Sequence, residues 1–168
     1  MRHTISVLVE NKPGVLARIS GLFSTRGFNI QSLTVGETED LSVSRMTIVV
    51  SGDDIILEQV SKQLNRLIDI IKVIDMTKEK FINRELAMVK VSINSTTRAE
   101  VMQVVDVFRG KVIDISPKTF TIEVTGTDDK IDALLELLKP FGIKEMVRTG
   151  AVALSREWHR EENKKPKQ

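Results

Sequence analysis

The sequence lacks cysteine and tyrosine, and its 168 residues include only two histidines and one tryptophan. The absence of cysteine excludes disulfide bonds, thiolate metal sites and cysteine nucleophiles. Few of the side chains that usually transfer protons in active sites are present, so hydrolysis and other proton-transfer chemistry is poorly supplied. The composition therefore argues against an enzyme of these kinds.

A strong charge of one sign is lacking as well. Lys and Arg number 25 against 23 Asp and Glu, a net charge of +2, so no chain-wide field would attract nucleic acid or an anionic membrane. The N-terminal apolar run is too short for a signal peptide or a membrane span. With 41% hydrophobic and 29% charged residues the composition is ordinary, and we expect a soluble, cytoplasmic globular protein.

The sequence does contain the same order of elements twice. In the first half, a strand over residues 4–9 precedes a helix over about 14–26. Two strands joined by the acidic turn GETED, a second helix and a last strand near residues 69–75 follow. The second half repeats this order from about residue 84. The predicted fold class is α+β, with two ferredoxin-like βαββαβ domains.

The domain bounds follow from where these periods stop. We predict domains at 1–77 and 85–154, a linker at 78–84 and a charged tail at 155–168. The linker lies in DMTKEKFINRE, which is charged and fits neither period. The tail has no apolar stripe, so we expect a solvated extension that packs loosely on the second domain.

The junction between the first strand and the first helix reads NKPG, from Asn11 to Gly14. Proline is tolerated in a first helical turn, because the N–H that it lacks would have no partner there. Glycine weakens a helix, which suggests that something approaches the backbone at Gly14. The unpaired N–H groups of a helix N-terminus bind carboxylate or phosphate, here at Gly14–Leu16.

Two asparagines flank this junction. Asn11 has an amide that can donate to a carboxylate or accept from an ammonium group. Asn29, at the start of the second strand, is placed to reach the same pocket. An amino acid would suit this set. The structural alternative, which the spacing alone modestly favours, is that Asn11 caps the helix and Gly14 eases a tight turn.

The second strand, NIQSLTV, carries neither charge nor proline after Asn29, and the usual ferredoxin-like order places it at the sheet edge. An unguarded edge invites pairing with another chain. The other edge, IDIIKVID, is blunted by Asp69, Lys72 and Asp75. We expect the first domain to form a homodimer through its second strand. The Asn11 loop and Asn29 would lie near the seam, where a ligand touches both subunits.

The stretch ENKPGVLARISGLFSTRGFNIQSLTV, followed by SRMTIVV, resembles the ACT domain of acetohydroxy acid synthase (acetolactate synthase) small subunits. NRELAMVKV, FRGKVIDI and RTGAVALSR extend the resemblance over nearly the whole chain except the tail. It implies a regulatory subunit without chemistry of its own. Such a subunit binds and activates a separate catalytic subunit, which holds thiamine diphosphate, magnesium and FAD, and makes it sensitive to feedback inhibition by valine. The resemblance implies no cofactor in this chain.

In this family, valine lies between two ACT domains, at the loop after the first strand and the start of the second. Ala17 and Gly36 depart from well-known bacterial members, where Ser and Ala are common, so leucine or isoleucine stays open as the effector. Carried over residue by residue, with the N–H groups named above, the predicted effector-binding residues are Asn11, Pro13, Gly14, Val15, Leu16, Asn29, Ile30 and Leu33.

Three other functions fit the same element order. RNA-recognition domains need stacking aromatics on their central strands, and TISVLV and SRMTIVV have none. An acyl-phosphate hydrolase would place an Arg in the first loop, where the only cation is Lys12, although Arg18 lies one turn into the helix. A stand-alone ACT-type amino-acid sensor with another output, such as transcription, is the main alternative. No DNA-reading segment is visible, so a catalytic partner is favoured.

Overall fold

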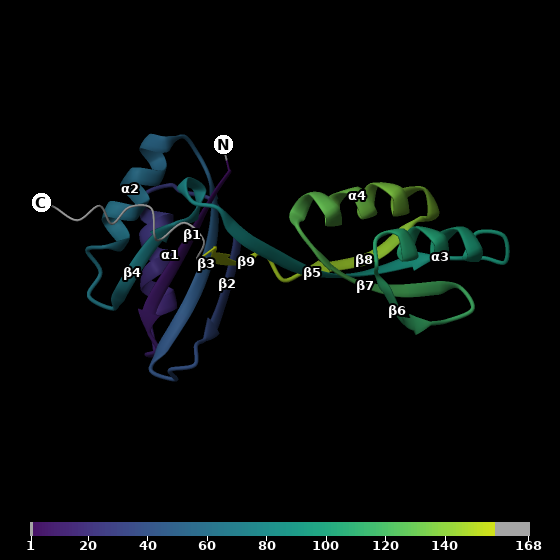
Figure 1. Cartoon of the computed structure of the whole chain (residues 1–168), viewed down its shortest axis with the longest axis horizontal. Helices are drawn as coiled ribbons and strands as arrows, with labels where there is room; N and C mark the ends of the chain where they lie inside the picture. Colours follow the sequence, from purple (N-terminus) through teal and green to yellow (C-terminus); the bar gives the residue numbers. More distant parts are fainter. Residues whose placement is uncertain (1, 157–168) are drawn as a thin grey trace, which may run out of the picture. The chain divides into compact units, whose positions relative to one another are not determined.

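The computed structural model describes residues 2–156, which form two compact units (Figure 1). The first unit consists of residues 2–82 together with 151–156, and the second of residues 83–150. Each has the predicted βαββαβ order with an antiparallel sheet, which confirms the α+β fold of two ferredoxin-like units. No helix among the described residues is long and apolar enough to cross a membrane.

The sheet of the first unit has the strand order β2-β3-β1-β4, so β2 lies at one edge, as predicted. Asp53 caps the second helix by accepting a hydrogen bond of 2.9 Å from the backbone N–H of Ile56. The elements in chain order are β1 (Arg2–Glu10), α1 (Val15–Thr25), β2 (Ile30–Glu37), β3 (Val43–Ser51), α2 (Asp54–Leu64), β4 (Ile70–Asp75) and the short helix η1 (Met76–Lys78).

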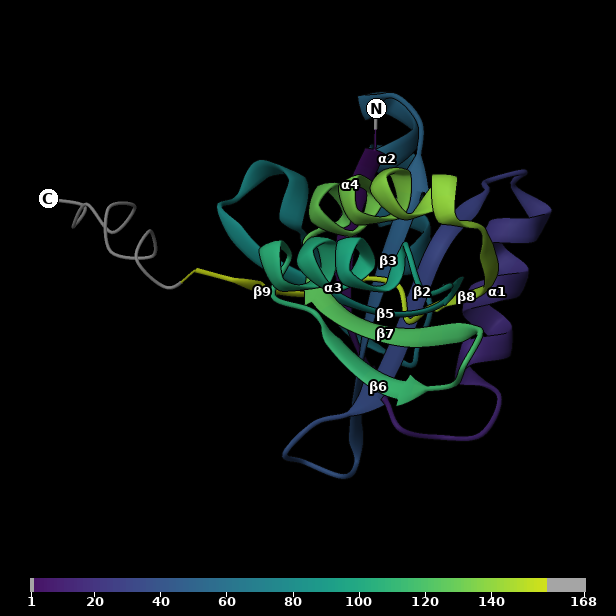
Figure 2. The same ribbon diagram turned by 90° about the vertical axis from the view of Figure 1, so that its right-hand side faces the viewer.

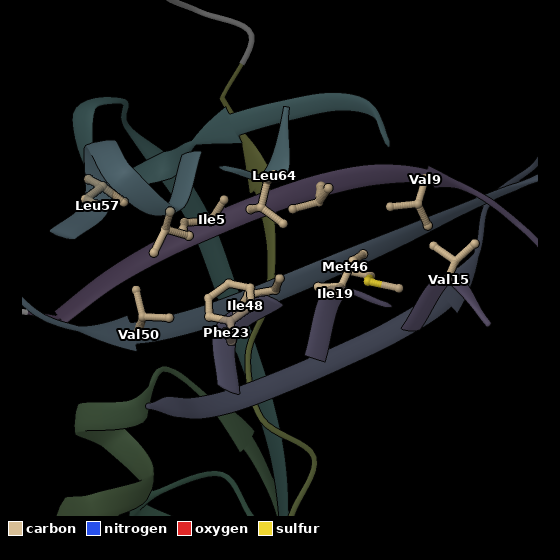
Figure 3. Close-up of a cluster of buried hydrophobic side chains, with 12 residues drawn as sticks. Ile5, Val9, Val15, Ile19, Phe23, Met46, Ile48, Val50, Leu57 and Leu64 are labelled. Carbon is tan, nitrogen blue, oxygen red and sulfur yellow. The ribbon is translucent and has the colours of Figure 1, made fainter. Parts of the chain in front are cut away.

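One face of this sheet packs on α1 and α2. Alternate residues of a strand point to the same face, and Ile5 of β1 and Ile48 of β3, which pair directly, are both fully buried in this core. Figure 3 shows the α1 residues Phe23, Ile19 and Val15 following one another along β3. The start of α1 therefore lies at the end of the core where β1 ends.

The opposite face of the same sheet is covered by β9 (Val152–Ser155), the last strand of the chain. Ser6 and Val49 point to this face and are fully buried. The Ala151 N–H, one residue before β9, donates a 3.1 Å hydrogen bond to Oγ of Ser32 on β2. The first unit is therefore completed by residues that follow the second unit in the sequence.

Because the chain returns to the first unit after the second, the observed bounds of the two units differ from the predicted domain bounds. Residues 78–84, the predicted linker, contain the start of a continuous strand that begins at Phe81. Residues 151–154, assigned to the second domain, return to the first unit and pair with that strand. Of the predicted tail, only Ser155 and Arg156 are described, and residues 157–168 lie outside the described part of the chain.

The side of β9 that faces the sheet carries a small residue. Ala153 is buried there, while its neighbour Leu154 is exposed. We expect Ala153→Leu to lower the free energy of unfolding of the first unit by about 2 kcal/mol, since extra methylene groups at a packed site force side chains or backbone to move. Leu154→Ala is the matched control and should change it by less than about 0.5 kcal/mol. Urea denaturation followed by circular dichroism measures both. Equal effects would contradict the packing of β9 described here.

The second unit repeats the layout, with strand order β6-β7-β5-β8. Both helices of this unit lie on the same side of its sheet in the two views (Figures 1 and 2). Buried residues of the central strands, such as Val89 and Ile122, pair directly and face these helices. The elements are β5 (Phe81–Ser92), whose first two residues belong to the first unit, α3 (Arg98–Val107), β6 (Lys111–Ile115), β7 (Thr119–Gly126), α4 (Asp128–Leu138), the short helix η2 (Lys139–Phe141) and β8 (Ile143–Arg148).

A buried ion pair ties β5, β8 and α4 together in this unit. Arg148 donates from Nε and Nη2 to Oε2 of Glu85, at 3.0 and 2.6 Å, and from Nη1 to Oδ1 of Asp132 at 2.6 Å. The side chain of Glu85 is only 2% exposed and that of Arg148 is 26% exposed. Burial acts to lower the pKa of the Arg148 guanidinium, but the hydrogen bonds and charges of the two carboxylates outweigh it and raise that pKa.

Candidate functional site

The loop between β1 and α1 ends in a left-handed glycine. Gly14 is the N-cap of α1, with φ of +86°, and no side chain caps the helix there. A side chain at this φ is strained, so the turn favours glycine. A Cβ on Gly14 would meet nothing within 4 Å, so the space in front of the helix is open. Gly14 therefore does ease a turn, but the interpretation of Asn11 as the helix cap is wrong.

The first turn of α1 keeps free N–H groups. The first hydrogen bond that closes a helical turn runs from Arg18 N to the Gly14 carbonyl at 3.0 Å, and Val15 N reaches the Lys12 carbonyl at a long 3.4 Å. Within the described residues, no acceptor contacts the N–H groups of Leu16 and Ala17. These donors and the positive end of the helix dipole are suited to a carboxylate.

Both cations of this segment are already paired. Lys12 Nζ lies 2.6 Å from Oε2 of Glu10, and this hydrogen bond and charge raise the pKa of Lys12. Arg18 Nη1 lies 2.6 Å from Oδ2 of Asp69, whose side chain is mostly buried. Arg18 is the residue that kept an acyl-phosphate hydrolase among the alternative functions. Its guanidinium is paired with the carboxylate of Asp69, the residue before β4. The loop therefore has little uncompensated positive charge with which to bind a phosphate, and a zwitterion suits it better.

Asn11 contacts two groups that the sequence did not point to. Its Nδ2 donates to Oε1 of Glu37 and to the carbonyl oxygen of Leu41, both at 2.9 Å. Its backbone N–H donates to the Ser42 carbonyl at 2.7 Å. The acidic turn GETED was the one signal in the sequence for a carboxylate in this region. The spacing of the residues does not show which side chain contacts Asn11.

The predicted residues do not all come together within one chain. Pro13 and Leu16 are exposed beside Asn11 and Gly14, while Val15 is buried in the core. Asn29 precedes β2, whose first residue pairs at the far end of β3, whereas Glu37 at the other end of β2 contacts Asn11. The seven steps along β2 place these two ends roughly 23 Å apart.

The same strand carries the remaining predicted residues. Ile30 and Leu33 of β2 are half-buried and pack against the core of the first unit. Further along, Val35 points to the helix-bearing face and is 46% exposed, like the 42% exposed Leu16 on α1. Within the described residues, β2 pairs on one side only, with β3. The strand with this free edge therefore carries an apolar side chain, Val35, that is open to solvent.

Residues 2–156 contain no group of three or more His, Asp or Glu side chains placed to hold a metal ion. The polar groups at the loop are the backbone N–H groups of α1, the Asn11 amide and the Glu37 carboxylate. Together they offer donors for a carboxylate and oxygen acceptors for an ammonium group.

Two family models match the chain. One is described as an AHAS small subunit-like ACT domain and matches residues 5–72, and the other is described as the small subunit of acetolactate synthase and matches residues 84–157. An acetolactate synthase small subunit of Mycolicibacterium smegmatis is 55% identical over 154 residues, which is 92% of this chain and 91% of that protein. The chain belongs to the acetolactate synthase small-subunit family.

Other members agree in sequence and in structure. The acetolactate synthase small subunit of Aquifex aeolicus is 58% identical over 157 residues, covering 93% of this chain and 82% of that protein. The crystal structure of the acetolactate synthase small subunit from Thermotoga maritima matches with a TM-score of 0.85 at 43% identity, over 93% of this chain and 98% of that chain. The resemblance seen in the sequence motifs is thereby confirmed, and the first unit is an ACT domain.

Proposed function

We propose that this chain is the regulatory subunit of an acetolactate synthase in branched-chain amino acid biosynthesis. It has no catalytic role of its own, binds and activates the catalytic large subunit, and confers feedback inhibition by valine. Thiamine diphosphate, magnesium and FAD belong to the catalytic subunit in this proposal. The observation that supports it best is the match to acetolactate synthase small subunits over 92% of the chain, together with the open helix N-terminus beside Asn11.

The effector site is completed by a second copy of the chain. The free edge of β2 is uncharged up to Glu37, and antiparallel pairing of two such edges places the start of one strand beside the end of the other. Asn29 of the partner subunit then comes next to Glu37 and the Asn11 loop, which resolves the separation within one chain. Val35 of β2 and Leu16 of α1 are both exposed, and in this proposal they provide apolar surface for the branched side chain.

Regulation follows from this placement. A ligand that bridges two subunits favours the arrangement of domains that it binds more tightly, and it shifts activity only by that difference in affinity. Without valine, the arrangement that activates the catalytic subunit prevails. The N–H groups of Leu16 and Ala17 take the carboxylate of valine, and Asn11 with Asn29 of the partner subunit orients its polar end.

Ligand binding gives a direct prediction. At a valine concentration one hundred times its dissociation constant, the free energy of unfolding of the ACT domain should rise by roughly 2.7 kcal/mol. Thermal unfolding of the purified chain with and without valine, leucine and isoleucine measures this rise, with D-valine as control. A melting temperature that ignores all three amino acids would contradict the proposed site.

Reconstitution tests the function itself. The activity of a cognate catalytic subunit is assayed with and without this chain, and valine is then titrated into the complex. We expect activation by the chain and inhibition by valine. Binding of valine without any change in catalytic activity would support the stand-alone sensor instead. A chain that remains monomeric at all concentrations in sedimentation would contradict the two-subunit site.

A further inference from the structure

The orientation of the Asn11 side chain is fixed by its neighbours. An amide nitrogen has two hydrogens to donate, and Asn11 Nδ2 gives one to Glu37 and the other to the Leu41 carbonyl, each at 2.9 Å. Both partners are acceptors only. The reverse orientation would bring the amide oxygen against a carboxylate and a carbonyl, so it is disfavoured.

The segment that supplies these acceptors is itself well ordered by hydrogen bonds. Asp40 accepts from the backbone N–H of Ser42 at 2.9 Å and from its hydroxyl at 2.6 Å, and these bonds lower the pKa of Asp40. The Thr38 hydroxyl donates to the Asp40 carbonyl at 3.0 Å. The turn between β2 and β3 therefore holds the Leu41 carbonyl in place, while Glu37, the last residue of β2, is held by the strand.

The free polar atom of Asn11 is then its oxygen. Among the described residues, no donor contacts Asn11 Oδ1, and the Leu16 and Ala17 N–H groups in the first turn of α1 are also unused. Asn11 can therefore accept a hydrogen bond from a ligand but has none to donate. Of the two roles that its amide chemistry allows, the geometry selects acceptance from an ammonium group.

We propose that Glu37 is a positioning residue, which holds Asn11 so that Oδ1 faces the effector and selects ligands with a free ammonium group. This inference rests on the proposed function, because it assigns the ammonium end of the same site. An α-amino acid satisfies both ends, with its carboxylate on the helix N–H groups and its ammonium on Asn11 Oδ1. A carboxylic acid with the same carbon skeleton leaves that oxygen unpaired and brings a negative charge toward Glu37.

The experiment compares L-valine with 3-methylbutanoate, which has the valine skeleton without the ammonium group. Affinities of the full-length chain are measured by isothermal titration calorimetry, with competition for the weaker ligand. The wild type should bind valine at least about tenfold more tightly than 3-methylbutanoate, which corresponds to one lost hydrogen bond to a charged group.

Three variants separate positioning from general stability. Glu37→Ala should weaken valine binding about tenfold, because Asn11 is then free to turn, and should not weaken 3-methylbutanoate binding, because the negative charge that opposes this ligand is removed. Glu37→Gln should restore valine binding to within about threefold of the wild type, since its side-chain carbonyl still accepts from Asn11 Nδ2. Glu39→Ala, an exposed acidic residue on the same turn, is the matched control and should bind both ligands like the wild type.

Each other outcome is decisive. Unchanged valine affinity in Glu37→Ala overturns the inference, and so does an equal loss for both ligands, which would make Glu37 a merely structural residue. A wild type that binds both ligands equally also overturns it while leaving the amino-acid site itself in place. A wild type that binds none of valine, leucine and isoleucine removes the proposed function and this inference with it.

Discussion

Replacing Arg148 by methionine should lower the free energy of unfolding of the second unit by about 3 kcal/mol. The methionine retains apolar volume but removes the guanidinium that contacts Glu85 and Asp132. The carboxylate of Glu85 is 2% exposed and would stay buried without the charge of Arg148. Removing one partner of a buried ion pair destabilises a protein strongly, because the remaining charge is desolvated and uncompensated. Hydrogen exchange measured by mass spectrometry checks this, because amides of β7 should exchange faster while those of β3 in the first unit keep their rates.

The same two strands carry a matched control. Lys90 on β5 and Glu145 on β8 form an ion pair of 3.2 Å, but their side chains are 41% and 74% exposed. Lys90→Met should therefore change the free energy of unfolding by less than about 1 kcal/mol. Adding Glu85→Gln to Arg148→Met should recover part of the loss, because it removes the buried charge. If Arg148→Met were no worse than Lys90→Met, burial of the pair would not be what stabilises this unit.

The repeated βαββαβ order was predictable because local pattern decides it. The apolar alternation of β1 and the helical spacing of α1 each imply one buried face, and both faces meet in the observed core. The edge position of β2 followed from the strand order common to this fold. Gly14 could be singled out from the sequence because glycine weakens a helix and is unfavourable at its start without a structural cause. Its φ of +86°, which favours glycine, is that cause.

Other features could not be predicted because they depend on residues far apart in the sequence. β9 covers the outer face of a sheet whose strands end 75 or more residues earlier, and the short run GAVALS does not reveal which face it will cover. The contact between Asn11 and Glu37 spans 26 residues and depends on the turn that precedes β3. That Asn11 lies at the opposite end of β2 from Asn29 within one chain depends on the register of β2 against β3, which the periodicity does not show.

Replacing Gly14 by aspartate should abolish the response to valine. The new carboxylate would stand at the mouth of α1, where the proposal places the ligand's own carboxylate. At a separation of ~4 Å and an effective dielectric constant near 20, their repulsion is of order 4 kcal/mol, which corresponds to a loss of affinity of about a thousandfold. Calorimetry with L-valine and the valine titration of the reconstituted enzyme both measure this loss.

Gly14→Asn separates charge from backbone strain. Asn and Asp are similar in size, both tolerate the left-handed region better than other residues, and a Cβ at this position meets nothing within 4 Å. Both variants should therefore share the same modest loss of stability, whereas only the aspartate repels an anion. An aspartate variant that binds valine as well as the asparagine variant would mean that the carboxylate of valine lies elsewhere than at the N–H groups of α1.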